Sequence, residues 1–358
     1  MGNDGHDKKR DMTYTQNREL SWLRFDERVL AESMDESVPL FERLKFIAIF
    51  ESNMREFLMV RMGGLSSLAT LKRQPRDNKS GMTPSEQVAA VFSELPGLFS
   101  KASASFDAIE SLLRAKGIER ITPAELIGTE RDTVRSYFNR NVQPIFSPLI
   151  IDPRHPFPNL RNGALYVVCT LASTSEDEQG LLGIIEVPTS LPRVIEVSNE
   201  NGLLRYILLE DTILACLDSC FGAYAPQDSA VIRVTRNADL DPDGEGVEED
   251  EDYRQHMKKV LKKRLRLQPV LLAIHGDLGR DAVKSIRKAL HLTQQAVLSV
   301  TMPLDLGFIF SLEGKLPRSS AREASVPPIR TAAEPHVLPG RTHARAGARR
   351  RQTALLSI

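Results

Sequence analysis

The first hydrophobic pattern along the chain has a helical period. Within residues 17–34, apolar side chains such as Leu20 and Leu23 fall near one stripe of a helix, and polar residues fill the other faces. Asn17 or Thr15 can cap its start, because a short polar side chain accepts hydrogen bonds from the N–H groups of the first turn. The pattern therefore predicts an amphipathic helix at the beginning of the chain.

Two further helices are predicted in the N-terminal third. One spans residues 37–62, with Ser37 as its expected cap and Pro39 in its first turn, where the missing N–H costs nothing. The other spans residues 83–118 and opens on Thr83, three residues before a glutamate, which is a capping-box pattern. This part of the chain is therefore expected to be all-α.

The pattern changes after residue 118. A further helix is predicted over residues 123–146, and short β-branched runs then alternate with helical stretches, which is typical of a mixed α/β domain. The predicted strands are 164–171, 181–187, 193–197, 230–236 and 269–276, and the predicted helices between and after them are 204–224, 251–267 and 278–296.

The predicted fold class is α+β. An N-terminal all-α helical domain is followed by a mixed α/β head domain and by a disordered C-terminal tail rich in Arg, Pro and Ala, which shows no lasting periodicity. The expected segments are a disordered start at 1–14, the helical domain at 15–118, the head domain at 119–315 and the tail at 316–358.

Composition narrows the range of functions. Lysine plus arginine and aspartate plus glutamate both total 47, so global charge favours neither a nucleic-acid-binding nor a membrane-surface protein. Three cysteines, Cys169, Cys216 and Cys220, are too few for a disulfide framework and match no spaced-pair zinc pattern. Cys216 and Cys220, four residues apart in a predicted helix, are expected to be small buried thiols on one face.

The sequence contains no evident targeting or membrane segment. The charged residues 1–12 are followed by no apolar signal core, and no apolar run reaches the ~18 residues that a membrane span needs. We therefore expect a cytoplasmic protein, with peripheral association with a membrane left open.

An acidic stretch from Asp239 to Asp250 approaches a calcium-binding loop. Asp239, Asp241 and Asp243 hold the first, third and fifth positions of such a loop, and Gly244 holds the sixth. The twelfth position, however, carries Asp250 in place of the bidentate glutamate. The alternative is a solvated acidic loop that leads into a helix, and this alternative is favoured.

A proline-rich segment, residues 152–159, presents His155 and Phe157 on a stiff loop, because each proline fixes φ and restricts the residue before it. Such a loop can be architectural or can hold an imidazole that faces a ligand, and architecture is favoured. The sequence contains no glycine-rich phosphate loop and no histidine beside a serine or cysteine nucleophile motif.

Polar residues interrupt the apolar helix pattern around Asn53. Asn53 and Glu56 are three positions apart and are therefore neighbours on one helix face. In one interpretation Asn53 forms a hydrogen bond between helices, while Glu56 and Arg61 form ordinary ion pairs. In the other, the amide of Asn53 is offered to a purine edge or to a phosphate.

Five collinear motifs resemble one family. The chain is similar to bacterial ATP-dependent polyphosphate kinases of the histidine-phosphorylating type, in order, over roughly residues 14–315. The motifs are NRELSWLRFDERVLAE, PLFERLKFIAIFESNMREFLMVRMGGL, FSPLIIDPRHPFPNLRN, VPTSLPRVIEV and IRVTRNADL.

The resemblance implies a function and one site residue. Members of this family transfer the terminal phosphate of ATP to polyphosphate, and back, through a phosphohistidine. In the family motif S-N-L-D-E-F the asparagine contacts ATP, and Asn53 stands at that position. ATP and polyphosphate are the implied substrates, Mg²⁺ is expected with ligands outside this chain, and a homo-oligomer is expected. No specific nucleic-acid partner is implied.

The chain departs from the family at two places. Arg55 stands where the family has aspartate, and a cationic side chain there can alter helix pairing or nucleotide affinity. The motifs of the two C-terminal catalytic domains do not occur, and neither His336 nor His343 in the tail is assigned their catalytic role. We therefore expect a truncated N-terminal and head portion, whether by natural truncation, by a frameshift or as a gene fragment, that binds ATP but does not make polyphosphate alone.

Two other interpretations remain. The chain can be a non-catalytic regulatory or oligomerisation module that pairs with a full-length kinase. The arginine-rich tail can also act as an arm for polyanions, with a solvated out-of-frame tail as the favoured alternative. The arginines concerned are Arg341, Arg345, Arg349, Arg350 and Arg351.

Overall fold

The computed structural model describes residues 16–152, 156–172, 180–200, 203–222, 224–238 and 267–316, all within one compact unit. Its α-helices are α1 (Arg18–Ala31), α2 (Leu40–Phe57), α3 (Gly63–Ala69), α4 (Pro84–Ala115), α5 (Gly128–Tyr137), α6 (Leu209–Ala215), α8 (Arg280–Ala289) and α9 (Phe308–Leu312). Its strands are β1 (Ile118–Arg120), β2 (Leu149–Ile151), β3 (Leu165–Ala172), β4 (Leu181–Glu186), β5 (Val194–Glu200), β6 (Leu203–Leu208), β7 (Ala225–Arg236), β8 (Pro269–Asp277) and β9 (Val297–Ser299).

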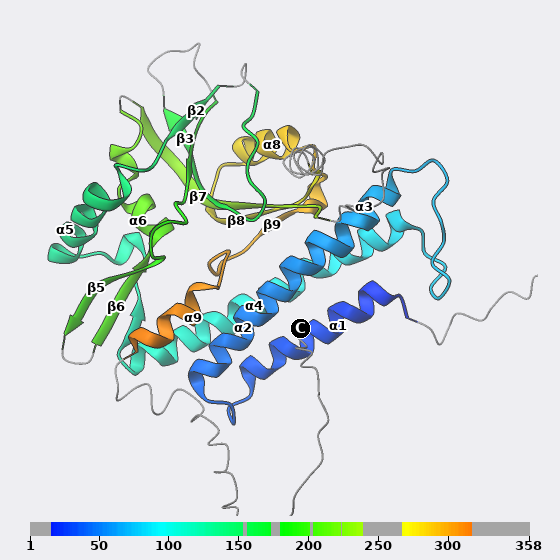
Figure 1. Ribbon diagram of the computed structural model, residues 1–358, viewed down its shortest axis with the longest axis horizontal. Coiled ribbons are helices and arrows are strands. Elements are labelled where there is room, and N and C mark those ends of the chain that lie inside the picture. Colours follow the sequence, from blue (N-terminus) through cyan, green and yellow to red (C-terminus); the bar gives the residue numbers. More distant parts are fainter. Residues whose placement is uncertain are drawn as a thin grey trace, which may run out of the picture. The chain divides into compact units, whose positions relative to one another are not determined.

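The predicted order of elements is confirmed. Helices α1 to α4 come first, and mixed sheets with accompanying helices follow them (Figure 1). Several predictions fall outside the described residues: the polar start at 1–14, the acidic loop at 239–250, the helix expected over most of 251–267, His155, and the tail from residue 317 with His336 and His343.

Helices α1, α2 and α4 pack on one another in the N-terminal region (Figure 1). Asn17 caps α1, and its side-chain oxygen accepts hydrogen bonds from the N–H groups of Glu19 (2.9 Å) and Leu20 (3.2 Å). The capping box at Thr83 is confirmed at the start of α4. Ser37 was the wrong cap for the second helix, because α2 begins at Leu40 with Pro39 in the N-cap position.

The second helix does not stop at residue 62. It passes through a π-helical turn, Leu58–Met62, into α3. Gly63 continues the helix instead of ending it, with φ of −57°. The end of β7 approaches at this point: a Cβ added to Gly63 would lie 2.2 Å from Oδ1 of Asn237. The glycine is therefore a contact point between the helices and the sheet.

The β-strands form two sheets. The larger has the order β2-β4-β3-β7-β8-β9, with antiparallel neighbours except for the parallel pair β8 and β9. The smaller has the order β1-β6-β5, in which β1 runs parallel to β6. Five predicted strands are confirmed as β3, β4, β5, β7 and β8, whereas β1, β2, β6 and β9 were not predicted.

The helix predicted over residues 204–224 is wrong in its first part. Residues Leu203–Leu208 form β6, which pairs with β1 on one side and with β5 on the other, and its Leu204 and Tyr206 are buried. Only Leu209–Ala215 is α-helical. The helix predicted over residues 123–146 is also shorter than expected, because α5 begins at Gly128 and a π-helical turn, Phe138–Val142, follows it.

Candidate functional site

A pocket of about 530 Å³ lies between α1 and the C-terminal part of α2 with the π-helical turn that follows. Helix α1 supplies two aromatic side chains, while α2 and the turn supply the polar ones. The lining residues are Trp22, Phe25, Asn53, Glu56, Phe57, Val60 and Arg61. The polar residues noticed in the sequence around Asn53 are therefore brought together at one surface.

Asn53 is anchored to α1 by a buried carboxyl group. Its Nδ2 donates a hydrogen bond of 3.0 Å to Oδ1 of Asp26, whose side chain is fully buried. Burial raises the pKa of Asp26 to about 7, although the hydrogen bond from Asn53 acts in the opposite direction. The predicted hydrogen bond between helices is thus confirmed, and Asn53 also lines the pocket.

The aromatic side of the pocket is held rigidly. The rings of Trp22 and Phe57 are stacked, with centroids 4.2 Å apart and planes 6° from parallel. Phe57 is buried, whereas Phe25 leaves 48% of its surface exposed at the pocket. This arrangement offers flat apolar surface beside a polar amide, which suits a planar, partly polar ligand.

Two charged side chains lie at the outer part of the pocket. Glu56 and Arg61 are both exposed, and neither forms an ion pair with another residue in the described part of the chain. The ion pairs expected for them from sequence are therefore not present among these residues. Arg61 supplies a solvent-exposed cation to the pocket lining, and Glu56 supplies a solvent-exposed anion.

Arg55 lies outside this pocket. It is two positions from Asn53, so the two side chains leave α2 about 200° apart. Its Nη1 lies 3.7 Å from Oδ2 of Asp305, which precedes α9. Burial alone would raise the pKa of Asp305. The charge of Arg193, 3.3 Å away, and the hydrogen bond from the N–H of Gly307 outweigh burial, so this pKa lies below its usual value. The sequence left open whether Arg55 alters helix pairing or nucleotide affinity. The geometry favours the first, an effect on how α2 packs against the rest of the chain.

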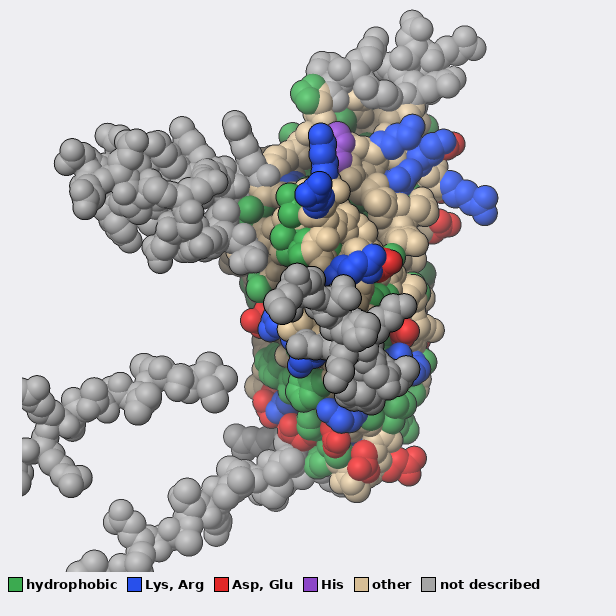
Figure 2. Space-filling view, turned by 90° about the vertical axis from the view of Figure 1, so that its right-hand side faces the viewer, with side chains coloured by type: hydrophobic (Ala, Val, Ile, Leu, Met, Phe, Trp, Pro, Cys, Tyr) green, Lys and Arg blue, Asp and Glu red, His purple; other side chains and the backbone are tan. Residues whose placement is uncertain are grey.

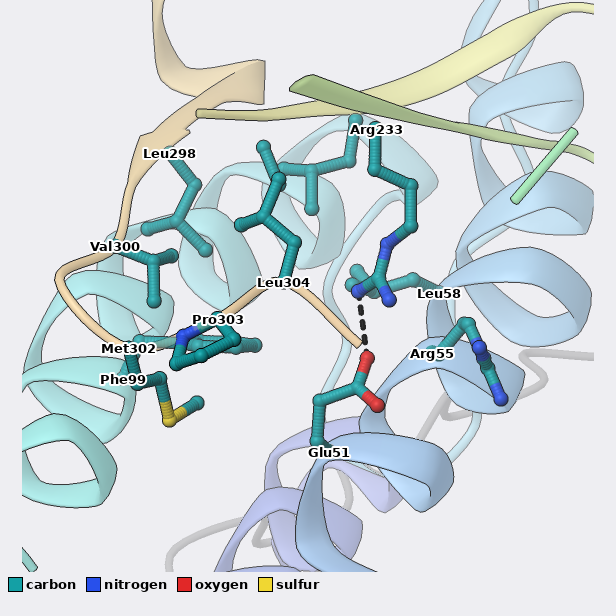
Figure 3. A pocket seen from close by; sticks show the side chains of 12 residues that line it. Glu51, Arg55, Leu58, Phe99, Arg233, Leu298, Val300, Met302, Pro303 and Leu304 are labelled. Atoms are coloured by element: carbon teal, nitrogen blue, oxygen red, sulfur yellow. Dashed lines mark ion pairs between the residues drawn. The ribbon is translucent and has the colours of Figure 1, made fainter. Parts of the chain in front are cut away.

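A buried ion pair joins α2 to the larger sheet (Figure 3). Arg233 points from β7 toward Glu51 on α2, with Nη2 2.6 Å from Oε1. Both side chains are about 95% buried or more, and Leu58, Phe99 and Leu304 are among the apolar residues around them. The remaining cavity there is about 10 Å³, which is room for no more than one water molecule. This contact is structural.

The two neighbouring cysteines have no metal-binding geometry. Cys216 follows the last residue of α6 and Cys220 follows a short 3₁₀ turn, so they do not share one helix as predicted. Both are buried and free, which confirms the prediction of buried thiols. In the described ranges, no group of three or more His, Cys, Asp or Glu side chains is placed to hold a metal ion.

The stiff proline-rich segment serves packing where it is described. Phe157 is partly buried and packs against the hydrophobic core. Asn162, just after this segment, accepts a hydrogen bond of 2.8 Å from the N–H of Arg236. The guanidinium of Arg236 in turn donates to the carbonyl groups of Leu160 and Leu267. These contacts are architectural.

Charge is mixed on the face drawn in Figure 2. Basic side chains, in blue, are spread over much of that face, and acidic side chains, in red, lie beside them and gather at its lower end. This agrees with the balanced totals of the sequence. Among the helices of the described residues, none is long and apolar enough to cross a membrane.

The fold and the pocket define a helical layer with a polar, aromatic-lined surface site, packed on a region of mixed sheets. The model for the polyphosphate kinase N-terminal domain matches residues 15–121, and the model for the polyphosphate kinase middle domain matches residues 129–312. The chain belongs to the polyphosphate kinase family.

Individual relatives agree with this assignment. A polyphosphate kinase of Bacillus anthracis is 35% identical over 315 residues, which is 86% of this chain and 44% of that protein. One of Mycobacterium tuberculosis is 34% identical over 310 residues, which is 83% of this chain and 41% of that protein. The chain therefore spans about two fifths of the length of these relatives.

A solved structure supports the fold. The crystal structure of polyphosphate kinase from Porphyromonas gingivalis matches with a TM-score of 0.66 at 24% identity, covering 84% of this chain and 41% of that chain. The N-terminal and middle-domain resemblance inferred from the five motifs is thus confirmed.

Sequence reasoning did not assign five residues of the site: Trp22, Phe25, Asp26, Phe57 and Val60. A signal for two of them existed, since Trp22 and Asp26 are four residues apart and share one face of α1. An acid on a face that also carries a tryptophan is a candidate for burial. Its partner, Asn53, could not be paired with it without knowing how α1 packs on α2.

Proposed function

We propose that these 358 residues bind ATP at the pocket between α1 and α2, as part of a polyphosphate-synthesising phosphotransferase. The observation that carries the proposal is the position of Asn53, the residue that the family resemblance assigns to ATP, in a pocket beside the stacked rings of Trp22 and Phe57. A nucleotide base is planar and carries polar edges, and this combination of surfaces fits it.

Phosphoryl transfer itself is not assigned to residues of this chain. Such transfer needs positioned cations and, in this family, an activated histidine nucleophile. His275 is the described histidine nearest to the sheet core, but its Nδ1 lies 3.1 Å from the carbonyl of Val300 and burial lowers its pKa. It is not placed as a nucleophile at the pocket. We propose that the chain alone does not synthesise polyphosphate.

The Mg²⁺ expected for the family does not fit any described group of residues here. The pocket contains one carboxylate, Glu56, beside the amide of Asn53, and the described ranges hold no cluster of three acidic, histidine or cysteine side chains.

A second candidate function is that of a regulatory or oligomerisation module that pairs with a full-length kinase subunit. Several large apolar side chains are exposed near β2, which is an edge strand of the larger sheet. They are Ile145 (49%), Leu149 (48%) and Ile150 (44%). Apolar side chains on an edge strand favour association. Co-purification of the chain with an intact kinase tests this candidate, and separate elution in size-exclusion chromatography would contradict it.

Two measurements test the primary proposal. Isothermal titration of ATP into the protein is expected to show saturable binding that Asn53→Ala weakens by about tenfold, since a lost hydrogen bond costs about 1 to 1.5 kcal/mol. Arg55→Ala serves as the matched control on the same helix. ATP-dependent polyphosphate formation by the purified chain, free of any longer kinase by mass spectrometry, would contradict the claim that it is inactive alone.

A further inference from the structure

Asp26 constrains which end of the Asn53 amide faces the pocket. The donor end, Nδ2, is engaged with Oδ1 of Asp26 at 3.0 Å. When the carboxyl group is ionised, turning the amide over would place Oδ1 of Asn53 against a carboxylate oxygen, and two acceptors at that distance repel each other. The fully buried position of Asp26 gives water no access to relieve the repulsion.

The acceptor end of the amide is therefore left for a ligand. In the described part of the chain, Oδ1 of Asn53 accepts no hydrogen bond, and it is not among the buried unpaired atoms. Asn53 is half-buried and lines the pocket together with Trp22 and Phe57. A ligand at this point meets an acceptor and flat apolar surface.

Two ligand groups can be separated on this basis. Phosphate oxygens are acceptors at neutral pH, so they cannot bond to Oδ1 of Asn53 and can reach this amide only through the second N–H of Nδ2. An amino group on a purine ring is a donor, and its ring can rest against the aromatic side chains. Of the two interpretations open from sequence, only the purine edge uses the carbonyl oxygen that this orientation presents to the pocket.

We propose that Asp26 is a positioning residue that fixes the carbonyl oxygen of Asn53 toward the pocket, and that the pocket thereby selects bases with an exocyclic amino donor, such as adenine. The inference deepens the proposed ATP site and rests on it. Asp26 does not touch the nucleotide. It acts through Asn53. Because Asp26 fixes the amide, an asparagine at this position can distinguish a base with an amino donor from a base without one.

The test compares ATP with inosine triphosphate, whose ring carries a carbonyl in place of the amino group. Isothermal titration at about pH 8, where the carboxyl is mostly ionised, is expected to show a preference for ATP of about tenfold in the unmodified chain. The isosteric Asp26→Asn variant can donate or accept, so it no longer fixes the amide. Its preference is expected to fall to within about threefold.

A double variant separates positioning from general damage to the fold. In Asp26→Asn with Asn53→Asp, the new amide on α1 donates to the new carboxylate on α2, whose second oxygen still presents an acceptor to the pocket. This exchange is expected to restore the preference for ATP. A merely structural role for Asp26 would not recover a base preference in this way.

Three results would overturn the inference. One is an Asp26→Asn variant that stays folded by circular dichroism and keeps the full ATP preference. Another is a preference that depends on the ribose instead of the base: 2′-deoxy-ATP would bind more weakly than ATP, whereas inosine triphosphate would bind as tightly as ATP. The third is the absence of ATP binding that depends on Asn53, which overturns the proposed function and this inference with it. The first two leave the ATP site itself standing.

Discussion

Asn53 and Arg55 lie two positions apart on α2 but contact different neighbours. Asn53 donates to Asp26 on α1 and lines the pocket, whereas Arg55 lies 3.7 Å from Asp305 on the other side of the helix. Arg55, which replaces the aspartate of the family motif, and Asn53, the residue assigned to ATP, therefore lie on opposite sides of α2. This relationship has a direct consequence for mutagenesis.

Replacing Arg55 should leave nucleotide binding almost unchanged. In Arg55→Ala, the affinity for ATP is expected to stay within about twofold of the unmodified chain, because Arg55 does not line the pocket. Thermal unfolding is expected to show a loss of less than about 1 kcal/mol, as for other partly exposed ion pairs. A large loss of ATP affinity in Arg55→Ala alone would show that Arg55 reaches the nucleotide.

The buried pair of Glu51 and Arg233 should be costly to break from one side. Arg233→Met leaves the carboxylate of Glu51 buried without its cation, and a loss of about 3 to 5 kcal/mol in the free energy of unfolding is expected. The double variant with Glu51→Met removes both charges and is expected to be more stable than Arg233→Met. Urea unfolding checks the order, and equal stability of the two variants would contradict the pairing.

Gly63 should tolerate no side chain while Asn237 is present. A Cβ at residue 63 would meet Oδ1 of Asn237 at 2.2 Å, so Gly63→Ala is expected to cost about 1 to 3 kcal/mol. In an Asn237→Gly background the same change is expected to cost much less, because the Cβ of residue 237, which would lie 2.9 Å from the new Cβ, is removed as well. Thermal unfolding of the unmodified chain and the three variants in this cycle measures the coupling, and additive costs would show that the contact is not responsible.

Asp26 should make stability depend on pH. Burial raises its pKa to about 7 in the folded chain, above the value of about 4 for an unfolded aspartate. The folded state therefore holds a proton that the unfolded state has lost, and the free energy of unfolding falls as pH rises from about 4 to about 7. The stabilising contribution is present below about pH 4 and is lost as pH rises through about 7.

The comparison of Asp26→Asn with the unmodified chain isolates this contribution. Between about pH 5 and pH 8 the unmodified chain is expected to lose about 2 to 3 kcal/mol more than the variant. Other groups titrate in both proteins, so their effects cancel in the difference. One of them is Asp211, whose pKa is raised to about 7 by burial and by the charge of Glu210. Parallel pH profiles for the two proteins would contradict the perturbed carboxyl.

Local signals predicted much of the helical region. Asn17 and Thr83 cap α1 and α4 as their residue types and spacing predict, because capping depends on groups within one turn. The end predicted for the second helix at residue 62 was wrong: the glycine pair Gly63 and Gly64 that follows would usually end a helix, but here Gly63 continues it at the point where Asn237 approaches. The strand β6 was missed because its apolar run continues directly into α6 without a polar break.

The candidate site was predictable only in part. Asn53 was identified through the family resemblance and not through its chemistry alone. Asp26, which holds it, is on another helix, and contacts between helices depend on packing that no local pattern encodes. The opposite orientations of Asn53 and Arg55, by contrast, follow from their spacing and could have been predicted.

The most direct test of the account uses Trp22, the only tryptophan of the chain. Because its ring is stacked on Phe57 and lines the pocket, its fluorescence reports binding at this place and not elsewhere. Titration with ATP is expected to change the emission saturably in the unmodified chain, with the midpoint about tenfold higher in Asn53→Ala. An emission that ATP does not change, or identical midpoints in the two proteins, would contradict the assignment of this pocket to the nucleotide.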